Sequence, residues 1–185
     1  MGSIKKELLS GVFYTAIAKY SGILISLIIT GVLARLISPD KFGIVAVVTV
    51  ITFFFSIFSD LGIGAAIIQN KELQQKDLNQ LFSFTVWSGC ILTLLFFLCS
   101  WPISFFYKEP SMKTITQLLA INLFFASANI VPNALLYKAK AFKFLAWRSL
   151  GVQVSGGIIA ILAALGGAGL YALIINPILS SILLF

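Results

Sequence analysis

The chain has 185 residues, of which 59% are hydrophobic and only 10% are charged. A soluble domain usually carries about 25% charged residues, so this composition excludes a water-soluble globular protein and predicts an all-α polytopic membrane protein. The net charge of +7 would suggest nucleic acid binding in a soluble protein, but basic residues in cytoplasmic loops account for it here, and we expect no nucleic acid partner.

Apolar stretches long enough to cross about 30 Å of hydrocarbon recur along the chain. They predict about six transmembrane helices, at about 11–36, 42–68, 78–101, 115–137, 145–165 and 170–185. Pro102 is expected to end the third helix, Asp77 to cap its start, and Gly166-Gly167-Ala168-Gly169 to form the turn before the sixth. The sixth stretch reaches only about 24 Å at Phe185, so we expect the sequence to be the front part of a longer protein.

Basic residues in the predicted loops favour one orientation. With a cytoplasmic N-terminus, the inner side holds Lys5, Lys6, Lys71, Lys76, Lys138, Lys140, Lys143 and Arg148, and the outer side holds Arg35, Lys41, Lys108 and Lys113. Lysine and arginine are enriched in cytoplasmic loops, so this bias predicts that the N-terminus lies inside.

Catalytic and metal-binding groups are scarce. The sequence has no histidine, and its two cysteines, Cys90 and Cys99, are expected on different faces of one helix. We therefore predict no metal, no cofactor and no disulfide. A membrane enzyme such as a polymerase or acyltransferase is disfavoured because the chain has no Asp-x-Asp pair and no cluster of acids.

Polar and small side chains recur every three or four residues along four predicted helices, which places each set on one helix face. The sets are Thr15, Lys19, Gly22, Ser26 and Thr30 in the first helix; Thr49, Thr52, Ser56 and Asp60 in the second; Asn122, Ala126, Asn129 and Asn133 in the fourth; and Ser149, Gln153, Gly156, Ala160 and Ala164 in the fifth. Close packing through small residues explains the fifth helix. The asparagines of the fourth, where Pro132 should add a kink, indicate either interhelical hydrogen bonds or a polar cavity.

Lys19 and Asp60 each place a charge well inside an apolar stretch, which costs about 2.5–3.5 kcal/mol at the centre of a bilayer. By the helical rise, both should lie about 12 Å from the inner boundary. Three interpretations remain open: a buried structural ion pair, a cavity that both residues face, or a Lys19 side chain that extends to the interface. Gly62 and Gly64, which follow Asp60, allow close backbone approach or a local helix break.

An ordered set of short motifs resembles a known family. The set comprises Leu33-Ala34-Arg35-Leu36-Ile37-Ser38-Pro39-Asp40-Lys41-Phe42-Gly43, Asp60-Leu61-Gly62 with Gln69, Phe106-Tyr107-Lys108-Glu109-Pro110, and Pro132-Asn133-Ala134-Leu135-Leu136 with Phe142. The chain resembles the Wzx-type flippases, including the colanic acid exporter group, of the multidrug/oligosaccharidyl-lipid/polysaccharide exporter superfamily.

This resemblance implies export of an oligosaccharide on undecaprenyl diphosphate across the bacterial cytoplasmic (inner) membrane, for lipopolysaccharide or exopolysaccharide synthesis. It also implies alternating access between two helical bundles, driven by an ion gradient, of which this chain would be the first bundle; membrane lipids and the missing second bundle are its expected partners. We expect Lys19 to compensate the diphosphate, and Ser26, Thr30, Asp60 and Asn129 to line the translocation path. The alternatives are a cation-coupled drug exporter of the same superfamily and a non-transporting membrane subunit of polysaccharide assembly.

Overall fold

The computed structural model describes the backbone of residues 2–60, 62–70 and 72–185, and the side chains of these residues from Phe13 onward. Its elements are α1 (Gly2–Leu36), α2 (Pro39–Asp60), α3 (Ile63–Gln69), α4 (Gln75–Tyr107), α5 (Pro110–Ala128), α6 (Ile130–Lys138), α7 (Phe142–Leu165), the 3-10 helix η1 (Gly169–Tyr171) and α8 (Ala172–Leu184). The described ranges are helical and contain no strand, which confirms the all-α prediction.

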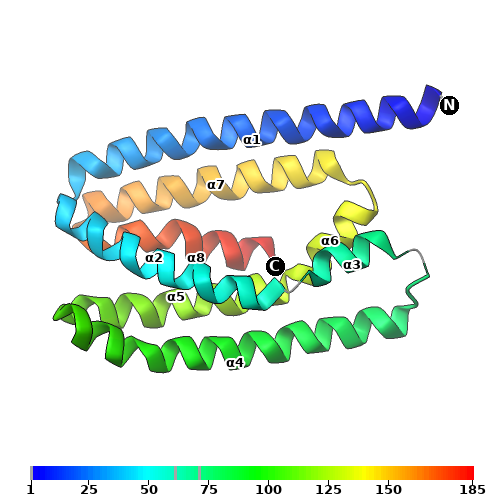
Figure 1. Ribbon diagram of the computed structural model, residues 1–185. Coiled ribbons are helices and arrows are strands. Elements are labelled where there is room, and N and C mark those ends of the chain that lie inside the picture. The colour runs from blue at the N-terminus through cyan, green and yellow to red at the C-terminus, as the bar shows by residue number, and fades with distance from the viewer. Residues whose placement is uncertain (1, 61, 71) are drawn as a thin grey trace.

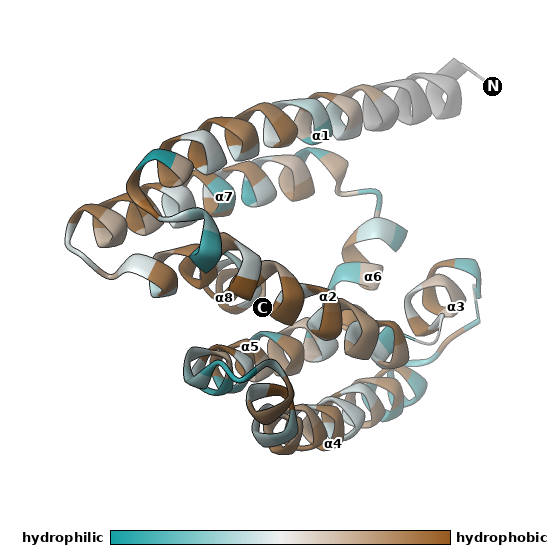
Figure 2. Ribbon diagram, turned by 60° about the vertical axis from the view of Figure 1, so that its left-hand side comes forward, coloured by the Kyte–Doolittle hydropathy of each residue, from teal (hydrophilic) through white to brown (hydrophobic). Residues whose placement is uncertain are grey.

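Five helical segments within these ranges are long and apolar enough to cross a membrane. They are Phe13–Leu36, Pro39–Gln69, Gln75–Tyr107, Pro110–Lys138 and Phe142–Leu165, and a shorter apolar segment, Gly169–Leu184, follows them. The prediction of about six membrane helices is therefore confirmed. Figure 2 shows hydrophobic residues along most of the helices and hydrophilic ones mainly near their ends and in the loops.

The helices run side by side along one direction, and the loops gather at two ends (Figure 1). The loops that follow α1, α4 and α7 lie at one end, and those that precede α4 and α7 lie at the other. This alternation separates the described inner and outer basic residues as the sequence predicted. Lys71 and the side chains of Lys5 and Lys6 lie outside the described residues, and the cytoplasmic location of the N-terminus stays a prediction.

Two of the predicted spans are each broken into two helices. Gly62, between α2 and α3, has a φ of 78°, in the left-handed region that glycine adopts without steric cost. In the fourth span, α5 ends at Ala128 and α6 begins at Ile130. Pro132 has no N–H to offer the carbonyl of Ala128, four residues earlier, and its ring crowds that carbonyl. The expected kink at Pro132 is therefore a break at Asn129.

The third predicted helix does not end at Pro102. Instead α4 continues through Pro102 to Tyr107, where Lys108 caps it in the left-handed conformation with a φ of 54°. Membrane helices tolerate an internal proline because neighbouring groups satisfy the freed carbonyl. The start of α4 also differs: Gln74 is the N-cap, and Asp77 is its capping-box partner, accepting the Gln74 N–H at 3.0 Å.

Three groups of buried side chains hold the bundle together. The first joins α2, α4, α5 and α8 around Val48, Phe96 and Leu123, the second joins α1, α7 and α8 around Ile29 and Ala160, and the third joins α3 to α6 through Ile67, Val131 and Ala134. The pairing of α3 with α6 gives the two half-helices beyond the breaks a core of their own.

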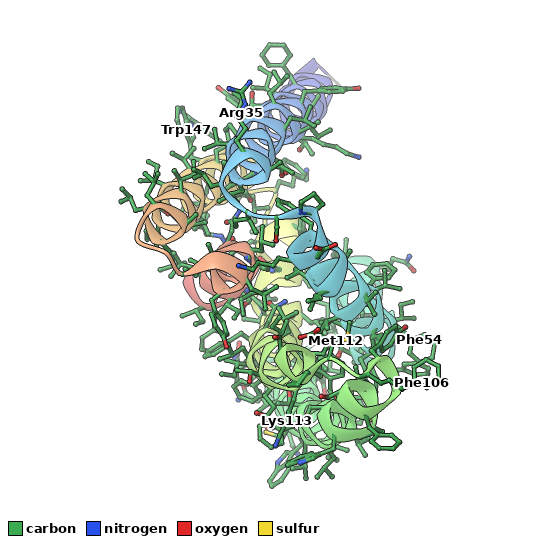
Figure 3. All side chains as sticks on the ribbon, turned by 90° about the vertical axis from the view of Figure 1, so that its left-hand side faces the viewer. Arg35, Phe54, Phe106, Met112, Lys113 and Trp147 are labelled. Atoms are coloured by element: carbon green, nitrogen blue, oxygen red, sulfur yellow. The ribbon has the colours of Figure 1, made fainter. Side chains whose placement is uncertain are left out.

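Large apolar side chains also cover the outside of the bundle. Phe54 is 57% exposed and Trp147 is 68% exposed. Figure 3 shows Phe54, Phe106 and Trp147 projecting from the periphery, whereas Met112 lies within the bundle. Such an apolar exterior suits contact with lipid tails, which are themselves apolar.

Small residues allow α7 to approach its neighbours closely. Gly156, Gly157 and Ala160 are buried. A Cβ atom at Gly157 would lie only 2.0 Å from Ile29 Cδ1 of α1, and one at Gly156 would lie 2.5 Å from Asn176 Oδ1 of α8. The predicted close packing is confirmed for this part of the helix.

Candidate functional site: a polar path inside the bundle

Three adjacent cavities contain most of the polar side chains that the sequence singled out. The Asp60 cavity, of about 430 Å³, lies where α2, α3, α5 and α6 meet. The Lys19 cavity, of about 270 Å³, lies between α1, α6 and α7. The hydroxyl cavity, of about 300 Å³, lies between α2, α5 and α8 and is lined by Thr49, Thr52, Ser56 and Asn122.

Shared lining residues place the three cavities next to one another. Ser56 and Ala126 line both the hydroxyl cavity and the Asp60 cavity. Tyr137, near the end of α6, lines both the Asp60 cavity and the Lys19 cavity. The cavities are therefore neighbours in a row from the middle of α2 to Lys19 on α1, and we call this row the polar path.

Lys19 lies on the wall of its cavity beside Thr15, Tyr137 and Ser149. Its side chain is exposed, and its ammonium group has no hydrogen-bond or ion-pair partner in the part of the chain described. Ser149, which the sequence pattern placed on a packing face, lines this cavity instead. An unpaired ammonium with hydroxyls beside it is chemically suited to an anionic ligand.

Asp60, the last residue of α2, lines the largest of the three cavities. Its Oδ1 accepts the backbone N–H of Gly64 at 3.4 Å, which gives a partner to one of the otherwise unpaired N–H groups in the first turn of α3. Ser59 and Asn133 line the same cavity. The carboxylate thus spans the break between α2 and α3 while facing open space.

Lys19 and Asp60 do not form the ion pair that one interpretation proposed. No salt bridge joins them within the described residues, and each lines a different cavity. The residue common to both cavities is Tyr137. The arrangement agrees with a cavity-facing position for both charges.

The other three predicted site residues occupy different environments. Ser26 and Thr30 are exposed and line neither the Lys19 cavity nor the Asp60 cavity. Asn129 is only 5% exposed, at the break between α5 and α6, and its Oδ1 has no partner among the described residues. It lines neither of those cavities, although its neighbour in the stripe, Asn133, lines the Asp60 cavity.

Arg148 counts among the basic residues of the inner side, near the start of the helix predicted at 145–165, and the structure places it within α7 and half-buried. It donates a hydrogen bond to the side-chain oxygen of Asn133, and its guanidinium lies 5.8 Å from the ring centre of Phe144. Its buried Nε has no partner in the described part of the chain. The sequence signal for the contact between Arg148 and Phe144 was their spacing of four residues, since residues at this spacing share a helix face.

These features define a polytopic α-helical membrane protein with a polar path inside its bundle. The chain belongs to the polysaccharide biosynthesis protein family, whose model matches residues 32–185. The match covers both broken spans and all three cavities apart from their α1 residues before position 32.

Three curated relatives that the chain matches are named for the biosynthesis of lipopolysaccharide, teichuronic acid and succinoglycan. The chain is 27% identical to the lipopolysaccharide biosynthesis protein WzxC of Escherichia coli K12 over 158 residues, which cover 85% of this chain and 31% of that protein. It is 28% identical to the teichuronic acid biosynthesis protein TuaB of Bacillus subtilis 168, covering 65% and 25%, and 22% identical to the succinoglycan biosynthesis transport protein ExoT of Rhizobium meliloti 1021, covering 82% and 31%. The chain spans about three-tenths or less of the length of these relatives. No solved structure matches it.

Proposed function

We propose that the full-length protein exports an oligosaccharide linked to undecaprenyl diphosphate across the bacterial cytoplasmic membrane. Alternating access between the described bundle and a second one would carry the substrate, with the N-terminus on the cytoplasmic side. Family membership supports this activity, and so do relatives named for lipopolysaccharide, teichuronic acid and succinoglycan biosynthesis. The protein is proposed to be a transporter and not an enzyme.

The unpaired ammonium of Lys19 is the observation that carries the proposal. A diphosphate leaving water loses hydration that only charge and hydrogen bonds can replace. Lysine supplies a compact positive charge with three rotatable donors, which suits a phosphate whose orientation changes during transport. Tyr137, on the same cavity wall, adds a hydroxyl donor, whereas the Ser149 hydroxyl already donates to the carbonyl of Leu145. Lys19 is therefore proposed to compensate the diphosphate in the inward-open state.

Asp60 has a different proposed role, because a carboxylate repels a diphosphate. It occupies the neighbouring cavity, where it is placed to bind the coupling cation or to adjust the potential around Lys19. The same feature is what favours the alternative function, a cation-coupled drug exporter, in which a cationic substrate would bind at Asp60 beside Tyr137.

Three variants of the full-length protein test the role of Lys19. In a strain that lacks its exporter, Lys19→Ala should abolish or strongly reduce surface polysaccharide while membrane abundance stays near wild type. Lys19→Arg should retain part of the activity because the charge survives. Lys143→Ala, which removes an exposed lysine outside the Lys19 cavity, is the matched control and should export normally.

The Asp60 variants separate substrate binding from an ion pair. Asp60→Ala should lower abundance slightly through loss of its contact with Gly64, and Lys19→Ala with Asp60→Ala should still fail to export. A structural pair predicts the opposite: each single variant loses abundance because one buried charge is left uncompensated, and the double variant recovers both abundance and export. Recovery of export in the double variant would refute the proposed role of Lys19.

A further inference from the structure

The hydroxyl cavity has a chemical character distinct from the two charged cavities. Thr49, Thr52 and Ser56 line it from α2, and Asn122 lines it from α5 on the opposite side. Its remaining lining residues are apolar, and no charged side chain takes part in its wall among the described residues. The cavity therefore offers hydrogen bonds but no charge compensation.

The three hydroxyl groups are oriented as acceptors. Each donates its hydrogen to a carbonyl of its own helix, at 2.7 Å from Thr49 to Val45, 2.8 Å from Thr52 to Val48 and 2.7 Å from Ser56 to Phe53. A hydroxyl that has donated its hydrogen keeps lone pairs to accept another hydrogen bond. The α2 wall consequently presents a row of acceptors to whatever occupies the cavity.

Asn122 supplies the complementary groups. Its side-chain amide carries two donor hydrogens and an acceptor oxygen, and it has no hydrogen-bond partner among the described residues. The residue is half-buried in a membrane-spanning helix, where an unsatisfied polar group is costly. The amide and the row of acceptors together suit a ligand that both donates and accepts hydrogen bonds.

The lining also limits which ligand can bind. A charged group would lose its hydration without meeting a counter-charge, and an apolar group would leave the Asn122 amide unpaired. A ring with several hydroxyls satisfies both requirements, and the exposed ring of Phe53 gives its C–H face an apolar surface. A neutral sugar is the ligand class that fits.

We propose that the hydroxyl cavity is a subsite for a neutral sugar ring of the transported oligosaccharide. This inference rests on the proposed function, which places the diphosphate at Lys19. The connection through Ser56 and Ala126 to the Asp60 cavity, and through Tyr137 to the Lys19 cavity, matches the order of the substrate, in which the sugars lie to one side of the diphosphate.

Binding to purified full-length protein tests the subsite with three probes. They are undecaprenyl diphosphate, the same lipid bearing a neutral trisaccharide of glucose, and the same trisaccharide with glucuronic acid as its last sugar, each measured by native mass spectrometry. The trisaccharide is needed because the Asp60 cavity lies between the Lys19 cavity and the hydroxyl cavity. The wild type should bind the glucose probe more tightly than the bare lipid and the glucuronic acid probe. Asn122→Ala and Thr52→Val should each reduce the preference for glucose, by roughly three- to tenfold for the asparagine, while the bare lipid binds as before.

The control variant is Thr116→Val, which removes a fully buried hydroxyl from α5 away from the cavity and should leave the preference unchanged. Equal binding of the bare and glucose probes by the wild type would overturn the subsite and leave the proposed function standing. Equal loss of both probes in Asn122→Ala would also overturn it, because the residue would then support the fold and not the sugar. If no lipid diphosphate binds to the wild type, and Lys19→Ala does not reduce export in cells, the proposed function itself is rejected.

Discussion

Gly157 provides a quantitative test of the contact between α1 and α7. Replacing a helical glycine by alanine normally gains about 1 kcal/mol. At this position the new Cβ would lie 2.0 Å from Ile29 Cδ1 and 2.7 Å from Ile29 Cγ1. Rotation about χ2 of Ile29 moves only Cδ1, so χ1 must also change, and χ1 of a β-branched residue is stiff. Overpacking of this kind costs about 1–3 kcal/mol, so after the helical gain is subtracted Gly157→Ala should lower the free energy of unfolding by up to about 2 kcal/mol.

The measurement is equilibrium unfolding in mixed detergent micelles, followed by tryptophan fluorescence. Gly151→Ala is the control in the same helix, because a Cβ there meets no described atom within 4 Å, and it should be neutral or gain about 0.5–1 kcal/mol. Ile29→Ala combined with Gly157→Ala should cost about 1–3 kcal/mol less than the sum of the single variants, since the new methyl fills the space left by isoleucine. Strict additivity, or equal effects of the two glycine variants, would refute the close contact between the two helices.

Three further predictions address the breaks, the core and the topology. Gly62→Ala should lower the free energy of unfolding by about 1–2 kcal/mol, because its φ of 78° is unfavourable for alanine, and thermal unfolding in detergent would measure the loss. Thr116→Val should raise it by about 1 kcal/mol, since the buried Oγ1 of Thr116 has no partner in the described chain, and the same assay measures the gain. In intact cells and a cysteine-free background, an impermeant thiol reagent should label a cysteine at position 108 but not one at position 140.

Each of these has a clear contrary result. An unchanged or higher stability of Gly62→Ala would mean that α2 and α3 form one continuous helix. A loss of stability in Thr116→Val would mean that its hydroxyl has a hydrogen-bond partner after all. Labelling at position 140 without labelling at 108 would invert the proposed orientation.

The membrane spans could be predicted because length and apolar composition are sufficient signals in a bilayer. The helix ends were less predictable, since they depend on local partners. Pro102 resembles a stop signal, yet α4 continues for five residues beyond it. Pro132 does disturb its helix as predicted, but the break lies at Asn129 because the lost hydrogen bond belongs to the carbonyl four residues before the proline.

The site was only partly predictable for a related reason. Periodicity places residues on one face of a helix but does not show which neighbour that face meets. The face of Thr49, Thr52 and Ser56 meets α5 across a cavity, which the spacing of these residues alone did not show. Ser26 and Thr30 share a face with Lys19 but are exposed and line neither charged cavity. The helical rise predicts a similar depth for Lys19 and Asp60, yet only tertiary structure shows that Tyr137 lies on the wall of both their cavities.

The helix breaks and the Asp60 cavity have a common physical origin. Breaking a helix inside a membrane frees backbone N–H and C=O groups, which is tolerated only where protein or a polar cavity can satisfy them. Asp60 accepts one such N–H from Gly64 at the first break, whereas at the second the backbone N–H of Asn129 donates to the carbonyl of Phe125 and its own carbonyl accepts from Asn133. The cavity lies where α2, α3, α5 and α6 all end or begin, so its polarity follows from the two breaks.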